Sequence, residues 1–151
     1  SNPPISEGQL VTVTGTMTTL NDERQIINAS VSVVLGVSVG LGPLAMSNLT
    51  VGGGPIPGWT LGVSGGVGLS NIGLLVKTWG RVIQTGTSPS PYFVLDDGSG
   101  VGVKVRVPSG CGLPSIGAFV TAVGISTSEL DGQGKRCRVI RARHASDITL
   151  R

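Results

Sequence analysis

From Val101 to Val107 every second residue is valine, and this strict alternation limits the fold of the chain more than any other feature. Its four valines share one side of an extended strand, while Lys104 and Arg106 share the other. A turn sequence, Asp96-Asp97-Gly98-Ser99-Gly100, separates this strand from the apolar segment Tyr92 to Leu95, which predicts a β-hairpin. Because the chain also holds 25 glycines and 9 prolines and lacks long helical periodicity, we expect it to be all-β.

Further strands flank this hairpin. They are expected at Leu74 to Gln84, Ala118 to Ser128 and Lys135 to Ala142. The two longer ones have a central glycine, Gly80 and Gly124, as expected where a barrel strand must bend sharply. The connector Pro108 to Gly117 contains three glycines and two prolines, so it has room for no more than one helical turn. This order of strand, hairpin, connector and hairpin is typical of a small closed barrel.

Four segments of the second half carry a family pattern: VKTWGRVIQTG, YFVLDDGSGVGVKVRVP, GAFVTAVGIS and RCRVIRARHASDI. In their glycines and alternation they resemble the OB-fold (oligonucleotide/oligosaccharide-binding) family, most of all the OB domains of secreted multi-domain bacterial proteins. The resemblance implies a five-stranded OB-type Greek-key barrel over about residues 71–151. It also implies, as a candidate function, binding of single-stranded nucleic acid.

The N-terminal half contains a partial repeat of this pattern. Gly8 to Gly15 aligns with Gly117 to Gly124, sharing both glycines and the central Val-Thr. Each is followed by a charged turn, Asn21 to Arg24 and Glu129 to Lys135, and then by an aliphatic strand, Gln25 to Ile27 and Cys137 to Ile140. The first half is therefore expected to contain a β-hairpin that resembles the last hairpin of an OB barrel.

A lone hairpin presents unpaired strand edges and needs a partner sheet. We expect the edge to lie at Leu10, Val11, Thr12, Val13 and Thr14. Its partner is either the uncharged stretch Ser30 to Leu44, which would close a partial barrel within the chain, or a strand of another subunit. The chain is thus divided into an N-terminal β segment (1–50), a Gly-rich ordered connector (51–73) and the barrel (74–151).

Charge is distributed unevenly along the chain. The 52 residues from Gln25 to Val76 contain no Asp, Glu, Lys or Arg. Residues 1–76 carry a net charge of −2 and residues 77–151 a net charge of +5. An uncharged stretch rich in Gly, Ser and Asn is either a surface that a partner covers or a bland exterior.

Two cysteines, Cys111 and Cys137, bear on whether the protein lies in an oxidising or a reducing compartment. An even number of cysteines in a lysine-poor β protein favours a disulfide and an oxidising environment, with two buried thiols as the alternative. The start Ser1-Asn2-Pro3-Pro4 fits a secreted, extracellular protein whose signal peptide has been removed, although a cloning boundary would look the same.

A nucleic-acid face would combine basic residues with an aromatic platform. The best candidates are Tyr92, Lys104, Arg106, Arg136 and Arg138. Trp79 and Phe93 are expected in the core, so Tyr92 is the one expected platform. The simpler interpretation is that these basic residues only keep a weakly charged domain soluble.

The sequence contains no enzymatic signature. His144 has no nucleophile or carboxylate at a recognisable spacing, and the Asp96 to Gly100 segment fits a hairpin turn better than a calcium loop. We therefore expect no catalytic residues, metal, cofactor or small-molecule substrate. No apolar run is long enough for a membrane span.

These features favour an extracellular, non-enzymatic structural protein. It is expected to assemble with copies of itself into a filament or surface polymer, with possible strand exchange between subunits. The alternative is a secreted OB-fold module that binds single-stranded nucleic acid.

Overall fold

The chain is an all-β protein, as the sequence predicts, and it divides into two compact units. The computed structural model describes residues 4–20, 23–38 and 40–151, and the units meet between Gly42 and Pro43. The N-terminal start (Ser1 to Pro3) and Asn21 and Asp22 of the expected charged turn lie outside the described residues.

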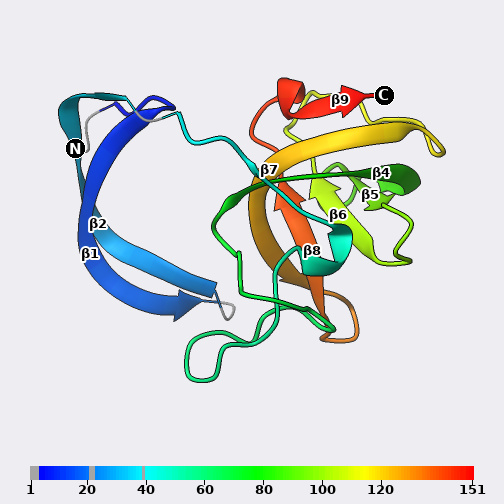
Figure 1. The fold of residues 1–151 in the computed structure, drawn as a ribbon, viewed down its shortest axis with the longest axis horizontal. Coiled ribbons are helices and arrows are strands. Elements are labelled where there is room, and N and C mark those ends of the chain that lie inside the picture. The colour runs from blue at the N-terminus through cyan, green and yellow to red at the C-terminus, as the bar shows by residue number, and fades with distance from the viewer. Residues whose placement is uncertain (1–3, 21–22, 39) are drawn as a thin grey trace. The chain divides into compact units, whose positions relative to one another are not determined.

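The second unit is built on a ring of five strands. They are β4 (Leu75–Gly86), β5 (Tyr92–Asp96), β6 (Gly102–Arg106), β7 (Phe119–Leu130) and β8 (Arg136–Arg141), close to the five predicted strands. The hydrogen-bonded order is β4-β5-β6-β8-β7, and β7 pairs again with β4, so the sheet closes on itself (Figure 1). All pairs in the ring are antiparallel except β6 with β8.

Four short elements complete this unit: β3 (Leu44–Ala45), η1 (Asn48–Thr50), η2 (Ala145–Asp147) and β9 (Ile148–Leu150). β3 lies parallel to β4, and β9 lies antiparallel to β7. The sequence did not predict β9, because a three-residue strand has no alternation to detect.

Two glycines allow the long strands to bend around the ring. A Cβ atom at Gly80 would collide with the backbone of Asp96, and one at Gly124 with the backbone of Arg141. Both positions therefore require glycine because a neighbouring backbone passes too close for any side chain. This is the physical basis of the bends predicted at these positions.

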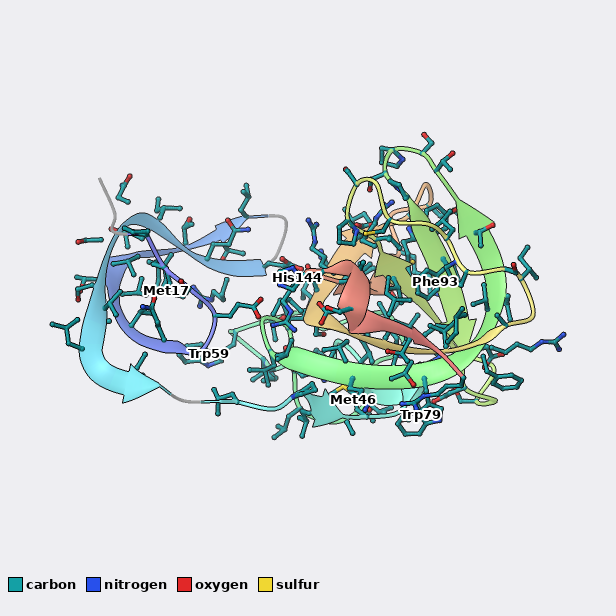
Figure 2. The ribbon with its side chains drawn as sticks, turned by 90° about the horizontal axis from the view of Figure 1, so that it is seen from above. Met17, Met46, Trp59, Trp79, Phe93 and His144 are labelled. Atoms are coloured by element: carbon teal, nitrogen blue, oxygen red, sulfur yellow. The ribbon has the colours of Figure 1, made fainter. Side chains whose placement is uncertain are left out.

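The barrel core follows the predicted alternation. Its buried side chains include Val76, Val82, Phe93, Leu95, Val103, Val105, Val120, Ala122 and Ile140. Phe93 is fully buried, as predicted, but the prediction that Trp79 is a core residue is wrong (Figure 2). Along β4 the even-numbered positions face inward, so Trp79 faces outward and is 49% exposed.

The segment ahead of β4 packs into the barrel. Asn48 is fully buried, and its side-chain amide donates to the carbonyl oxygens of Leu95 and Val101, at 2.9 and 3.0 Å. Its Oδ1 accepts a hydrogen bond from the Thr78 hydroxyl at 2.8 Å. Val51 joins the core with no exposed surface.

The Gly-rich connector is held by a second buried amide. Asn71 accepts hydrogen bonds from the Gly52 amide at 2.8 Å and the Ser126 hydroxyl at 2.9 Å. It donates to the Thr50 carbonyl at 2.7 Å. Asn71 therefore ties both ends of the connector to β7.

The first unit is a two-stranded antiparallel hairpin of β1 (Gln9–Leu20) and β2 (Glu23–Ser38), both strongly curved (Figure 1). Val11 lies opposite Val33 and Val13 opposite Val31, so four valines share one face. Threonines alternate with Val11, Val13 and Met17 along β1 and form the other face. No described side chain of either strand is buried.

Replacing Asn48 by alanine should destabilise the barrel by about 3 kcal/mol, because two carbonyls and a hydroxyl would lose their buried partner. Urea unfolding followed by tryptophan fluorescence measures this change. The exposed Gln133→Ala variant is the control and should change stability by less than about 0.5 kcal/mol. Equal effects of the two variants would show that Asn48 does not hold the segment in place.

Candidate functional site

Three of the five predicted nucleic-acid residues gather on the outer face of the barrel. The charged groups of Lys104 and Arg106 lie over the Tyr92 ring, 5.2 and 5.4 Å from its centroid. Arg106 also donates to both carboxylate oxygens of Glu129, at 2.9 and 2.6 Å, and Lys104 lies 3.4 Å from the same carboxylate. Tyr92 is therefore covered by cations that already have a partner, which leaves it a poor platform for a base.

Glu129 controls the charge of this cluster. The hydrogen bond from Arg106 lowers the pKa of the Glu129 carboxyl, and the charges of Arg106 and Lys104 add to that effect against the opposing effect of burial. The same pair raises the pKa of Arg106. The cluster stays ionised and internally paired at neutral pH.

The structure places the other two predicted residues, Arg136 and Arg138, away from this face. They are 8% and 9% exposed, because residues 136, 138 and 140 of β8 face inward. The Arg138 guanidinium donates to the carbonyls of Gly65, Ser64 and Leu49, at 2.7, 3.2 and 3.3 Å. Burial lowers its pKa. The Arg138 side chain and the Arg136 backbone therefore anchor the connector, and neither side chain is exposed to a phosphate backbone.

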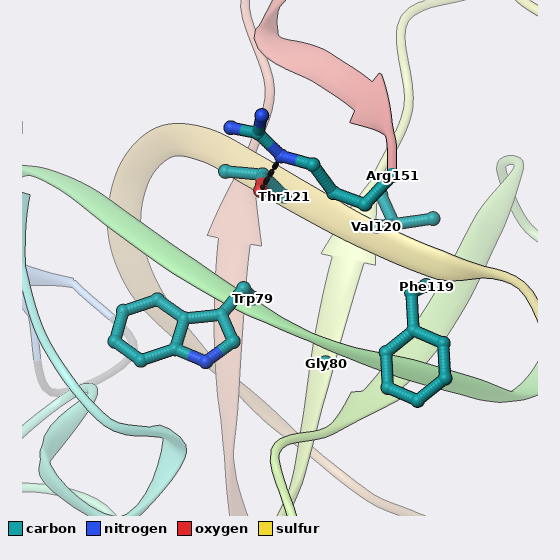
Figure 3. A pocket seen from close by; sticks show the side chains of 6 residues that line it. All are labelled: Trp79, Gly80, Phe119, Val120, Thr121 and Arg151. Carbon is teal, nitrogen blue, oxygen red and sulfur yellow. Dashed lines mark hydrogen bonds between the residues drawn. The ribbon is translucent and has the colours of Figure 1, made fainter.

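A pocket that the sequence did not predict lies on the outer face of β4, β7 and the residue after β9. It has a volume of about 430 Å³ and is lined by Trp79, Gly80, Phe119, Val120, Thr121 and Arg151. Trp79 and Phe119 are 49% and 60% exposed and stand on either side of Gly80 (Figure 3). The Arg151 Nε donates to the Thr121 hydroxyl at 3.0 Å, which holds the guanidinium over the pocket.

Two further cationic residues lie on β4, one of the strands that form this pocket. Lys77 and Arg81 lie on the same outward face of β4 as Trp79, and neither forms an ion pair with any described residue. Asp96 lies opposite Arg81 in the sheet, but its Oδ1 accepts hydrogen bonds from the amides of Gly98 and Gly100. The odd-numbered spacing of Lys77, Trp79 and Arg81 was the sequence signal for this surface.

The expected disulfide is absent, since both cysteines are free thiols. Cys111 packs against the barrel core, whereas Cys137 lies on the outer side of β8 with its Sγ 3.8 Å from the Asp131 carboxylate. Burial raises the pKa of the Cys137 thiol, and the Asp131 charge adds to this increase. The two thiols thus occupy different environments.

The predicted assembly edge, Leu10 to Thr14, lies on β1. One side of β1 pairs with β2, which includes Ser30 to Ser38 of the stretch expected to complete it. Leu44, the end of that stretch, belongs instead to β3 beside β4. Within the described part of the chain the other side of β1 has no strand partner, and the hairpin does not close into a barrel.

The acidic residues of the turns are used in backbone contacts. Asp97 accepts a hydrogen bond from the Asn48 amide at 2.8 Å, and Asp147 accepts from the amides of Arg143 and His144 at 2.8 and 3.3 Å. Among the residues that the structure describes, no three His, Cys, Asp or Glu side chains are grouped to hold a metal ion. The described residues also include no helix with the length and apolar character to cross a membrane.

No protein-family model, curated protein or solved structure matches this chain.

The Glu129 cluster predicts a pH dependence. Because the folded-state pKa lies below the ordinary value of 4.5, its stabilisation is present above pH 4.5 and is lost as the pH falls through the lower, folded value. Glu129→Gln should lower the free energy of unfolding at pH 7 by about 1–2 kcal/mol and by much less at pH 3. Urea unfolding at both pH values measures this. Glu7→Gln, in the other unit, is the control, and a pH-independent loss in Glu129→Gln would contradict the prediction.

Proposed function

We propose that this protein is a non-enzymatic extracellular structural module, built on an OB-type Greek-key barrel, that assembles with neighbours through its N-terminal hairpin. The ring order β4-β5-β6-β8-β7, with one parallel pair, supports the OB-type assignment. The barrel forms a stable platform with both edges of each ring strand paired along part of its length. The hairpin has no such closure.

The uncovered apolar face of the hairpin is the observation that carries this proposal. Val13, Met17 and Ile26 are 42%, 56% and 45% exposed, and they belong to one face of a two-stranded sheet. Isolated two-stranded hairpins are marginal in water. Burying such side chains contributes about 1.5–3 kcal/mol each, so covering this face is a strong drive for association.

The free edge of β1 would determine how a partner strand pairs with the hairpin. Leu10 to Thr14 can accept a further strand through backbone hydrogen bonds, as in other cases of strand addition. The hairpin carries only Glu7, Asp22, Glu23 and Arg24 as charged residues, so little charge opposes its burial. Repeated contacts between this edge and a different surface of the next copy would produce a filament.

Val13→Lys should abolish association, because it places a charge in the centre of the apolar face. Thr12→Lys, on the opposite face of the same strand, is the matched control and should leave association intact. Sedimentation velocity and electron microscopy over a range of protein concentrations measure the effect, and we expect the association constant to fall at least about tenfold in Val13→Lys. A wild-type chain that stays monomeric at the highest concentration would contradict self-association through the hairpin.

A second function, binding of single-stranded nucleic acid, is supported by the Trp79 pocket. Two exposed aromatic rings flank a glycine, and three cationic residues, Lys77, Arg81 and Arg151, lie around them. This combination of stacking surfaces and phosphate partners is typical of sequence-tolerant binding of single strands. The covered Tyr92 ring supports it less.

If this second function holds, a labelled oligothymidylate should quench tryptophan fluorescence and bind more weakly as salt is added. Phe119→Ala should lower the affinity about 5- to 100-fold, because each stacked base contributes about 1–3 kcal/mol. Tyr92→Phe, which keeps the ring under its cations, should bind like the wild type. Binding that does not respond to salt or to Phe119→Ala would argue against this function.

A further inference from the structure

The hairpin β1-β2 has the same strand register as the barrel's own closing hairpin, β7-β8. Met17 pairs with Ile26 as Ser126 pairs with Ile140. Thr19 pairs with Arg24 as Ser128 pairs with Arg138. The first strands thus correspond at a shift of 109 residues and the second strands at a shift of 114. Both β1 and β7 are 12 residues long.

The glycines that bend these strands also correspond. A Cβ atom at Gly15 would collide with Ile27 and Ile26, just as one at Gly124 would collide with Arg141 and Ile140. In both hairpins the same close approach of the second strand forces the first to curve. The curvature of the isolated hairpin is therefore that of a barrel wall.

The second half of β2 corresponds to the last strand of the barrel. Val13 pairs with Val31 and Val11 with Val33, as Ala122 pairs with Ile148 and Val120 with Leu150. In the barrel η2 separates β8 from β9. In the hairpin the register shifts near Asn28, whose φ is 51°, and the strand continues. One continuous strand thus covers both pairings.

The two hairpins also agree in which residues face inward. Val120, Ala122 and Ile140 lie in the barrel core with at most 1% exposure. Their counterparts are Val11, Val13 and Ile26, the residues of the uncovered apolar face. Threonines occupy the counterparts of the outward positions. The face left exposed on the hairpin is the core face of a barrel wall.

In the barrel, that core face is covered by a meander of three strands. β4 pairs antiparallel with β7 along Phe119 to Ile125, and β6 pairs parallel with β8 along Val139 to Arg141. The corresponding positions on the hairpin are Leu10 to Thr16 and Gln25 to Ile27. Along these edges β1 and β2 have no other strand beside them in the described residues.

We propose that β1-β2 is the closing hairpin of a second barrel, completed by a three-stranded meander built like β4-β5-β6 from a polypeptide segment outside residues 1–151. The first strand of that meander pairs antiparallel with Leu10 to Thr16, and its third strand pairs parallel with Gln25 to Ile27. This inference rests on the proposed function in taking the hairpin as the element of assembly, and it replaces a second copy of residues 1–151 by this segment as the partner that covers the hairpin.

A second copy of this chain fits the hairpin less well than such a segment. Each copy has one meander, and β4 and β6 already pair with its own β7 and β8. Donating that meander would expose the β7-β8 core face in place of the β1-β2 face. Exchange between copies therefore buries no additional apolar surface, because it covers one hairpin and uncovers another. An additional meander covers the β1-β2 face without uncovering the β7-β8 face.

The test adds a synthetic peptide of residues 74–107 of this chain to the full-length protein and follows amide hydrogen exchange. We expect exchange along Leu10 to Thr16 to slow at least tenfold, while exchange along Phe119 to Ile125 stays unchanged. The control peptide carries Val103→Lys and Val105→Lys, which remove its apolar face, and should protect nothing. Thr12→Lys protein should still respond to the peptide, and Val13→Lys protein should not.

If the peptide is insoluble, the same segment joined by a Gly-Ser linker ahead of the full chain replaces it. Protection of Leu10 to Thr16 in a monomeric fusion supports the inference. The inference is overturned if Leu10 to Thr16 stays unprotected with both the peptide and the fusion. It is also overturned if the wild-type protein shows the same protection through self-association, without any added meander. If Val13→Lys still abolishes self-association in that case, the proposed assembly function stands without this partner.

Discussion

Pairing of β4 with β7 is the interaction on which the barrel depends. It turns a row of strands into a ring, so that backbone donors and acceptors of the ring strands face a neighbour. The bends at Gly80 and Gly124 make this closure possible, and the alternating valines then converge on one core. The same constraint explains the hairpin, which has the curvature and the apolar face of a wall but lacks the opposite wall.

Closure alone does not fill the barrel. The buried amides of Asn48 and Asn71 and the guanidinium of Arg138 bind backbone groups of strands and connector, which satisfies polar groups that would otherwise be buried without partners. The absence of charged residues between positions 25 and 76 has two explanations. Part of this stretch forms β2, which contributes to an exposed apolar face, and part of it packs against the barrel as a Gly-rich connector.

The strands of the barrel could be predicted because their signals are local. Alternation, Asp-Gly turns and single glycines identified all five ring strands to within a few residues. The roles of the arginines could not be predicted this way. In β8 the sequence Arg-Cys-Arg-Val-Ile-Arg has basic residues at both odd and even positions, so its inward face is ambiguous. The carbonyls that bind Arg138 lie in a connector far away in the sequence. Trp79 was misassigned to the core although it alternates in step with Lys77 and Arg81, which mark the outward side of β4.

The anchoring of the connector by Arg138 has a consequence for the order in which this chain folds. Gly65 and Arg138 are 73 residues apart. The Ser64 amide also donates to the Arg136 carbonyl, and the Arg136 amide donates to the Ser64 hydroxyl, so the connector lacks these anchors until β8 is in place. Contacts of such long range are formed late, because a large loop must be closed before they stabilise anything. During synthesis, residues 51–73 would emerge well before their binding partners. The last strand of the ring to be made thus orders a segment from the middle of the chain, so truncation before Arg136 would remove these anchors as well as leave the ring open.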